Sequence, residues 1–301
     1  VETGDLHLQA GGTIGEAGNF FDVLVGGDLS GTAGQDIFLN SPATLNITTL
    51  SSTHGDITLT VQGDVNIGLM QAREGTVFIT ADGRIDDRYD DAAADIESIS
   101  VALDSANGTI GRLANPLDID TSFGGVLGSI NAVALSTVYL VETAGVMRID
   151  KVRSRNDDVH LKSLAGSITD ANADLANNVT AHSVHLTATG GSIGTPSDAL
   201  EVDTSNPGKG VLDAFAPQSV NVTETAGTLC VGTVTAQGGN VILSVRDNAG
   251  AGDNLVMEAG SSVGAPATSA GNGDVLLQAG DNVHLQAGSS ISSVRHIKVH
   301  T

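Results

Sequence analysis

The chain is poor in the residues on which most globular cores and secreted scaffolds depend. Its 301 residues include no Trp, only 3% aromatic residues and a single cysteine, Cys230. Aromatic side chains supply much of the buried area of an ordinary core, so a core built around them is excluded. One cysteine excludes a disulfide within the chain, and Cys230 stands in the alternating stretch GTLCVGTV, where we expect a small buried apolar side chain.

Basic residues are also scarce. The chain has 13 Lys and Arg against 35 Asp and Glu, a formal net charge of −22. Such a charge repels the phosphates of nucleic acids and the surface of anionic membranes, so neither is an expected partner. No run of 18 apolar residues predicts a membrane-spanning helix, so we expect no membrane insertion. The first ten residues, VETGDLHLQA, lack the basic and apolar segments of a signal peptide.

What the chain has in abundance is glycine and a short repeated phrase. The segment 273–291 reads GDVLLQAGDNVHLQAGSSI, in which Val275, Val283 and Ile291 are eight residues apart. The segments 35–39, 55–59 and 75–79 repeat a similar apolar-x-apolar phrase at a regular step of about 20 residues. Alternating apolar residues predict short strands with one buried face, and Gly, Asn and Asp between them predict turns.

A longer period is superimposed on the short one. Segment 144–149 matches 226–231, and 158–161 matches 240–243, both at the same longer step. The phrase PLDID at 116–120 recurs as ALEVD at 199–203. These matches give a large period of about 82 residues, which corresponds to about four units of about 20 residues.

Short strands at a fixed period predict an all-β fold, a parallel β-solenoid with about 20 residues per coil and about fifteen coils. Within one coil we expect Val275, Leu277, Val283 and Leu285 to point inward and Leu276 and His284 to point outward. A tandem array of small β-sandwiches is the alternative fold that the large period allows. Because the chain begins and ends in mid-pattern, we expect residues 1–301 to be one solenoid and a segment of a longer repetitive protein.

The phrases GDVLLQAGDNVHLQAGSSI and GDITLTVQGDVNI resemble the repeats of filamentous haemagglutinin-like bacterial exoproteins. The longer phrases PLDID…VETAGVMRIDKV and ALEVD…VTETAGTLCVGTV are similar to the large repeats of giant adhesin-type surface proteins. The resemblance implies a right-handed parallel β-helix, secretion to the bacterial cell surface and a role as stalk or adhesive fibre. It implies no catalytic residues and no enzyme.

Two acidic loops are candidate calcium sites. Asp-x-Asn-x-Asp places oxygen ligands at alternate positions, as calcium loops do, although the turn glycine and the closing Glu of an EF-hand are missing. A solvated turn is the alternative for both loops. The candidate Ca²⁺ ligands are Asp170, Asn172 and Asp174 in one loop and Asp86, Asp87, Asp90 and Asp91 in the other.

Three further groups of residues have a functional and a structural interpretation. Strand-borne histidines could form a ladder or bind a transition metal, or they are ordinary surface residues; they are His7, His160, His185 and His284, with His182 and His185 as the close pair. A basic stretch could receive an anionic glycan, or it neutralises acidic neighbours; it comprises Arg148, Lys151, Arg153 and Arg155. Carboxylates on expected strands could serve a polysaccharide-degrading site, but they recur with the repeat; they are Asp118, Asp120, Glu201 and Asp203.

The sequence therefore predicts a structural stalk or fibre module of a bacterial extracellular protein. A polysaccharide-binding or polysaccharide-degrading β-helix is the alternative. The expected partners are the chain itself, joined end to end or within a longer polypeptide, and a glycan or cell surface. End-to-end joining is suggested by the match of residues 6–11 to residues 283–288.

Overall fold

The chain is a β-solenoid protein. The computed structural model describes residues 2–125, 127–205, 208–250, 252–266 and 273–301. Almost all of its regular structure is parallel β-sheet, wound into about 13 turns of about 22 residues. It divides into two compact units, residues 1–145 and residues 146–301, here called the N-terminal and C-terminal units.

The N-terminal unit contains fifteen strands and one 3-10 helix among its described residues. They are β1 (Glu2–Thr3), β2 (Leu6–Ala10), β3 (Phe21–Asp22), β4 (Leu24–Val25), β5 (Asp28–Ala33), β6 (Ile37–Ser41), β7 (Leu45–Ser52), β8 (Ile57–Val61), β9 (Val65–Ile67), β10 (Met70–Ala81), β11 (Ile85–Asp87), β12 (Ile96–Ser105), β13 (Leu117–Asp120), η1 (Phe123–Gly125), β14 (Ile130–Ala134) and β15 (Val138–Glu142).

The C-terminal unit contains fifteen more strands among its described residues and no helix there. They are β16 (Met147–Ser154), β17 (Val159–Ser163), β18 (Ile168–Asp170), β19 (Val179–Thr180), β20 (Val184–Ala188), β21 (Leu200–Asp203), β22 (Val211–Ala216), β23 (Val220–Glu224), β24 (Leu229–Ala236), β25 (Val241–Val245), β26 (Leu255–Ala265), β27 (Val275–Gln278), β28 (Val283–Leu285), β29 (Ser290–Ser293) and β30 (Ile297–His300). Across the described part of the chain, no helix is long and apolar enough to cross a membrane.

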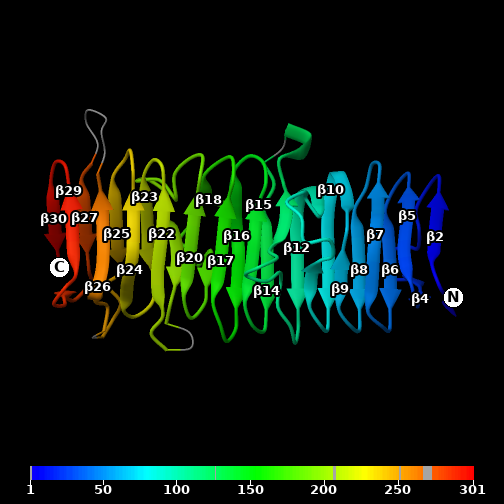
Figure 1. Cartoon of the computed structure of the whole chain (residues 1–301), viewed down its shortest axis with the longest axis horizontal. Helices are drawn as coiled ribbons and strands as arrows, with labels where there is room; N and C mark the ends of the chain where they lie inside the picture. Colours follow the sequence, from blue (N-terminus) through cyan, green and yellow to red (C-terminus); the bar gives the residue numbers. More distant parts are fainter. Residues whose placement is uncertain (1, 126, 206–207, 251, 267–272) are drawn as a thin grey trace. The chain divides into compact units, whose positions relative to one another are not determined.

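Strands of successive turns pair in parallel, and in the N-terminal unit they form three ladders (Figure 1). One ladder joins β6, β8 and β10, a second joins β7, β9 and β11, and a third joins the last residues of β7 to the first residues of β10. The first two ladders correspond to the two strands expected from the eight-residue spacing. The third lies in the longer connection between them, where the sequence pattern alone did not single out a strand.

The core of each unit is a column of stacked aliphatic side chains. In the N-terminal unit Ile37, Ile57 and Val77 are register partners in successive turns, and all three are fully buried. In the C-terminal unit Val159 pairs with Val184, and both are equally buried. Each such side chain contributes about 1.5–3 kcal/mol by leaving water. Cys230 on β24 is buried as well, which confirms it as a small core residue.

Aspartates at the corners connect one turn to the next. Oδ1 of Asp36 accepts a hydrogen bond of 2.8 Å from the backbone N–H of Asp56, and Oδ1 of Asp56 accepts one of the same length from Thr76. The glycine of the Gly-Asp phrase is required by this approach, because a Cβ added to Gly55 would lie 2.3 Å from Oδ1 of Asp36. The phrase thus encodes a corner that fixes the neighbouring turn.

The turns are longer on average than the sequence period predicts. Ile37, Ile57 and Val77 follow one another at the predicted step, but Val241 pairs with Val275, which makes that turn much longer. Insertions at corners, such as the loop that holds η1, lengthen single turns without disturbing the ladders (Figure 1). The expected fifteen coils are therefore about 13.

The predicted faces hold for β27 and, in β28, for the outward His284 but not for the two residues expected to be buried. Val275 and Leu277 are buried and Leu276 is not, as expected. Val283 is only half-buried, and Leu285 is 55% exposed. β28 pairs with β26, and alternation along the strand points Leu285 to the same side as Val283. Too few neighbouring side chains lie there to bury Leu285.

Candidate functional site

The acidic loop after Ile85 sends its four aspartates to different places. Asp86 is 1% exposed, and its carboxylate is held by Arg112, whose Nε donates a hydrogen bond of 3.1 Å to Oδ1. Arg84 approaches the same carboxylate at 3.6 Å. Asp90 and Asp91 are exposed, and Oδ1 of Asp91 accepts the N–H of Ala93 at 2.8 Å. The structure therefore does not bring these four carboxylates together.

The second predicted loop is organised by Asp170. Its buried carboxylate accepts N–H hydrogen bonds from Asn172, at 2.9 Å, and from Asp174, at 3.0 Å. The amide of Asn172 points elsewhere and donates to Oδ1 of Asp150 at 2.6 Å, and Oδ1 of Asp174 accepts the N–H of Ala176. The three predicted ligands thus serve loop hydrogen bonds, and calcium binding in both loops stays a prediction.

Asp87, the remaining member of the first loop, belongs to a buried cluster of carboxyl groups. Oxygens of Asp87, Asp95 and Asp118 lie within 4.8 Å of one another, and all three side chains are buried. Oδ2 of Asp95 accepts the N–H of Asp118 at 2.9 Å. Burial, with a smaller contribution from the carboxylates of Asp87 and Asp118, raises the pKa of Asp95 to about 9 against the lowering effect of the Asp118 N–H. Asp95 therefore carries a proton at neutral pH.

The corresponding place in the C-terminal unit explains what that proton does. Asn178 occupies the position in the second large repeat that Asp95 occupies in the first. Its Oδ1 accepts the N–H of Glu201 at 2.9 Å, and its Nδ2 donates to Oδ1 of Asp170 at 2.8 Å. Like the amide of Asn178, the protonated carboxyl group of Asp95 can accept one hydrogen bond and donate one. Oδ2 of Asp87 is buried and has no hydrogen-bond partner among the described residues, so it is the acceptor available to that proton.

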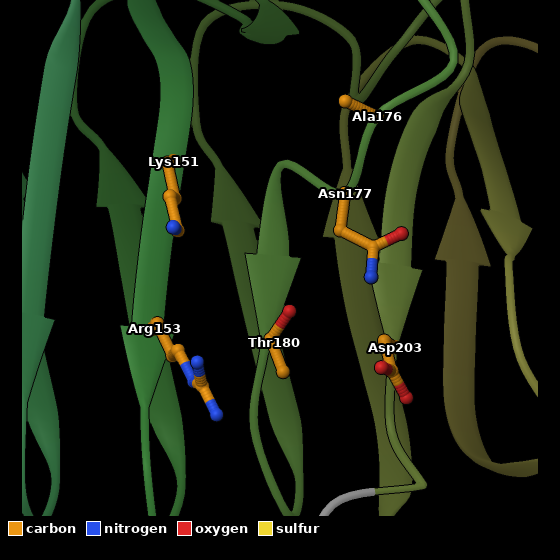
Figure 2. A pocket seen from close by; sticks show the side chains of 6 residues that line it. All are labelled: Lys151, Arg153, Ala176, Asn177, Thr180 and Asp203. Atoms are coloured by element: carbon orange, nitrogen blue, oxygen red, sulfur yellow. The ribbon is translucent and has the colours of Figure 1, made fainter.

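A polar pocket of about 420 Å³ lies on the C-terminal unit. Lys151 and Arg153 on β16 line one side, and Asn177, Thr180 and Asp203 come from the neighbouring segments (Figure 2). Ala176 completes the lining. Nε of Arg153 is buried without a hydrogen-bond partner in the described structure. The pocket offers two cations, an amide, a hydroxyl and a carboxylate, which are groups that bind an acidic sugar.

The structure divides the predicted basic stretch. Only Lys151 and Arg153 reach the pocket. Arg148 instead donates to the backbone carbonyl of Ala171 at 2.5 Å, which places it against the loop of Asp170. Arg155 is not among the residues that line the pocket. Lys151 and Arg153 are two residues apart and lie on one face of β16, whereas Arg155 follows the end of that strand.

The four carboxylates considered as possible catalytic residues occupy matching positions in the two units. Oδ1 of Asp120 accepts hydrogen bonds from the N–H and the hydroxyl of Ser122, and Oδ1 of Asp203 accepts the same pair from Ser205. Asp118 belongs to the carboxyl cluster. Glu201 lies 3.7 Å from Arg246, and burial raises its pKa to about 7. The contacts of Asp120 and Asp203 thus recur with the repeat, whereas Asp118 and Glu201 have different neighbours.

The strand histidines near the two ends of the chain are exposed, as expected. The two in the middle of the chain are closer to each other than the sequence indicated. His7 and His284 are exposed. His160 and His185 are half-buried register partners with stacked rings.

No family model, curated protein or solved structure matches this chain, so functional inference depends on the fold and its side chains.

Proposed function

We propose that this chain is a non-catalytic structural module, a stalk or fibre segment, of a bacterial extracellular adhesin-type protein. The observation that supports it is the in-register stacking of parallel turns. Ile37, Ile57 and Val77 exemplify a ladder in which every turn is hydrogen-bonded to the next. Force applied along such a stack acts on many backbone hydrogen bonds together.

Corner side chains add a second set of connections. The carboxylates of Asp36, Asp56 and Asp64 each bind a backbone N–H one turn later, at 2.7–2.8 Å. Charge-assisted bonds of this kind are stronger than neutral ones. They support a role in carrying load, because they resist the separation of neighbouring turns. The resemblance to haemagglutinin-like repeats supports the surface location.

Single-molecule pulling tests the proposal. Turns of about 22 residues should release in steps of roughly 75 Å of contour length or small multiples of it. Ile57→Ala should lower the release force, whereas Thr58→Ala, on the outward face of the same strand, should leave it unchanged. Collapse of a whole unit in one event at low force would contradict a load-bearing role.

Surface location needs its own test. Antibodies against this chain should label intact cells of the native bacterium, and external protease should remove the label. Labelling that appears only after lysis would contradict the extracellular part of the proposal.

Association with a second copy is part of the same proposal. Ile297 and Val299 on β30 are 49% and 47% exposed. Leu285 on β28, which precedes them in the sequence, is also exposed. The match of residues 6–11 to 283–288 makes another copy a suitable partner for this edge. Sedimentation should show association that Ile297→Lys with Val299→Lys removes and that His300→Lys, on the same strand, does not. A strict monomer at high concentration would contradict association between chains.

A second candidate function is binding of an acidic polysaccharide at the pocket of Lys151 and Arg153. The buried, unpaired Nε of Arg153 is the observation that favours it. Oligogalacturonate should bind, its uncharged methyl ester should not, and Lys151→Ala with Arg153→Ala should abolish binding. Lys298→Ala, an exposed lysine on β30, is the matched control. Equal binding of the charged and esterified sugars would exclude this role for the pocket.

A further inference from the structure

Two histidines of the C-terminal unit face each other across neighbouring turns. His160 on β17 and His185 on β20 are direct register partners, and their flanking residues Val159 and Leu186 are buried. The two rings are nearly parallel, with an interplanar angle of 10° and centroids 4.2 Å apart. The parallel pairing of outward positions therefore creates a pair of imidazoles that neither strand presents alone.

Asp158 completes a mixed group of possible metal ligands. One carboxylate oxygen of Asp158 and one ring nitrogen from each of His160 and His185 lie within 4.8 Å of one another. Oδ1 of Asp158 accepts the backbone N–H of Ser183 at 3.0 Å, which fixes the carboxylate against the next turn. All three side chains are half-buried, so an ion can reach them from solvent.

A second carboxylate orients one of the rings. Nδ1 of His185 lies 3.0 Å from Oδ2 of Asp213, and Oδ1 of Asp213 accepts the N–H of Thr233 at 2.6 Å. A hydrogen on Nδ1 leaves the lone pair of Nε2 for an ion. A carboxylate behind a metal-binding histidine is the usual outer partner in such sites, because it fixes the ring and raises its basicity.

A metal ion binds the neutral form of an imidazole ring. A third ring is close by, since Nδ1 of His182 lies 3.3 Å from Oδ1 of Asp158.

We propose that His160, His185 and Asp158 form a binding site for a divalent transition metal ion of the zinc class. Two imidazoles and one carboxylate suit Zn²⁺, Ni²⁺ or Cu²⁺, whereas Ca²⁺ requires six to eight oxygen ligands. Water or His182 supplies the fourth position. Asp213 is a positioning residue, which acts on the ion through His185.

Binding requires a small rearrangement. Ligand atoms of a tetrahedral zinc are about 3.3 Å apart, so the group must close by up to about 1.5 Å. The rings must also turn out of their parallel stack, because the in-plane lone pairs of parallel rings do not converge. Such rotations move side chains on the outer face and leave the paired backbones of β17 and β20 in place. The ion would then join two turns of the solenoid.

Calorimetric titration of the whole chain with ZnCl₂, after treatment with a chelator, tests the site. One ion should bind per chain, and the melting temperature should rise with zinc. His160→Gln and His185→Gln should each lose both effects. Asp213→Asn should weaken zinc binding by about 10- to 100-fold while retaining one site. His284→Gln, an exposed strand histidine of the same unit, is the control and should bind as the parent does.

Folding of the variants is checked independently of zinc. The metal-free melting temperature of His160→Gln and His185→Gln should stay close to that of the parent, because both rings lie on the outer face. The absence of zinc binding by the parent, or binding that both glutamine variants retain, would overturn the proposal. Equal competition by millimolar CaCl₂ would overturn the assignment to the zinc class.

Discussion

The hydroxyl of Thr121 donates a hydrogen bond of 2.6 Å to Oε2 of Glu142, and both side chains are buried. The backbone N–H of Thr121 reaches Oε1 of the same carboxyl group at 3.1 Å. In the C-terminal unit, Thr204 and Glu224 repeat both contacts with the same lengths. The large repeat in the sequence therefore preserves a buried hydrogen-bonding unit as well as an apolar pattern.

Removing either hydroxyl should destabilise its unit. Thr121→Val and Thr204→Val keep the side-chain volume but leave a buried carboxyl oxygen without its donor, at a cost of about 1–3 kcal/mol in the free energy of unfolding. Urea unfolding followed by circular dichroism measures it. Thr58→Val, on an outward position of β8, should change stability by less than about 0.5 kcal/mol. Equal effects at all three positions would contradict a specific role for the buried pair.

The free energy of unfolding should fall as pH rises from about 4 to about 9. Burial raises the pKa of Asp95 to about 9, of Glu224 to about 8 and of Glu142 to about 7, from ordinary values near 4. The folded state thus holds protons that the unfolded chain has released. Their contribution is fully present below about pH 4 and is lost as pH passes through 7 to 9. Melting temperatures measured from pH 5 to pH 9.5 should decrease, and a rising curve would contradict the protonated state.

Asp95→Asn should remove part of that pH dependence. The substitution installs the amide that Asn178 supplies in the other unit, which needs no proton to donate to Asp87. At pH 8 the free energy of unfolding should be higher for the variant than for the parent, by on the order of 1 kcal/mol or more. The reverse change, Asn178→Asp, should lower stability at pH 8 and add pH dependence. A destabilised Asp95→Asn protein would instead indicate that the carboxyl group itself is needed.

Val159→Asp should prevent folding of the C-terminal unit. Val159 is fully buried against Val184, and an unpaired charge there would lie in an apolar column. Lys162→Asp places the same side chain on the exposed face of the same strand and should fold. Circular dichroism and proteolysis distinguish the two outcomes. A Val159→Asp protein that melts like the parent would reverse the assignment of the inner face.

Calcium should stabilise the protein beyond the effect of ionic strength, if the acidic loops bind it at roughly 10⁻⁴–10⁻³ M. Melts in millimolar CaCl₂ are compared with melts in NaCl of matched ionic strength. Asp90→Ala with Asp91→Ala, and separately Asp174→Ala, should reduce the calcium effect. Asp170→Ala is less informative, because it removes loop hydrogen bonds with or without calcium. Equal midpoints in the two salts would make both loops ordinary turns.

Local patterns in the sequence were sufficient to predict the solenoid. Alternation in segments such as 55–59 predicts strands, and the regular step between such segments predicts their stacking. The carboxyl cluster could not be predicted in this way, because Asp118 meets Asp87 and Asp95 only when the following turn is placed beside theirs. One signal was available: when the two large repeats are aligned, Asp95 stands opposite Asn178. The exposed state of Leu285 also depends on which turns surround it, and alternation within a strand carries no such information.

The corner aspartates give the stack a direction. Asp36 accepts a hydrogen bond from the backbone N–H of Asp56, and Asp56 accepts one from Thr76, so in both bonds the acceptor belongs to the earlier turn and the donor to the later one. A chain leaving the ribosome makes its acceptors first. Each new turn can therefore attach to a finished template instead of waiting for residues not yet made, and the order of synthesis coincides with the order in which these bonds can close.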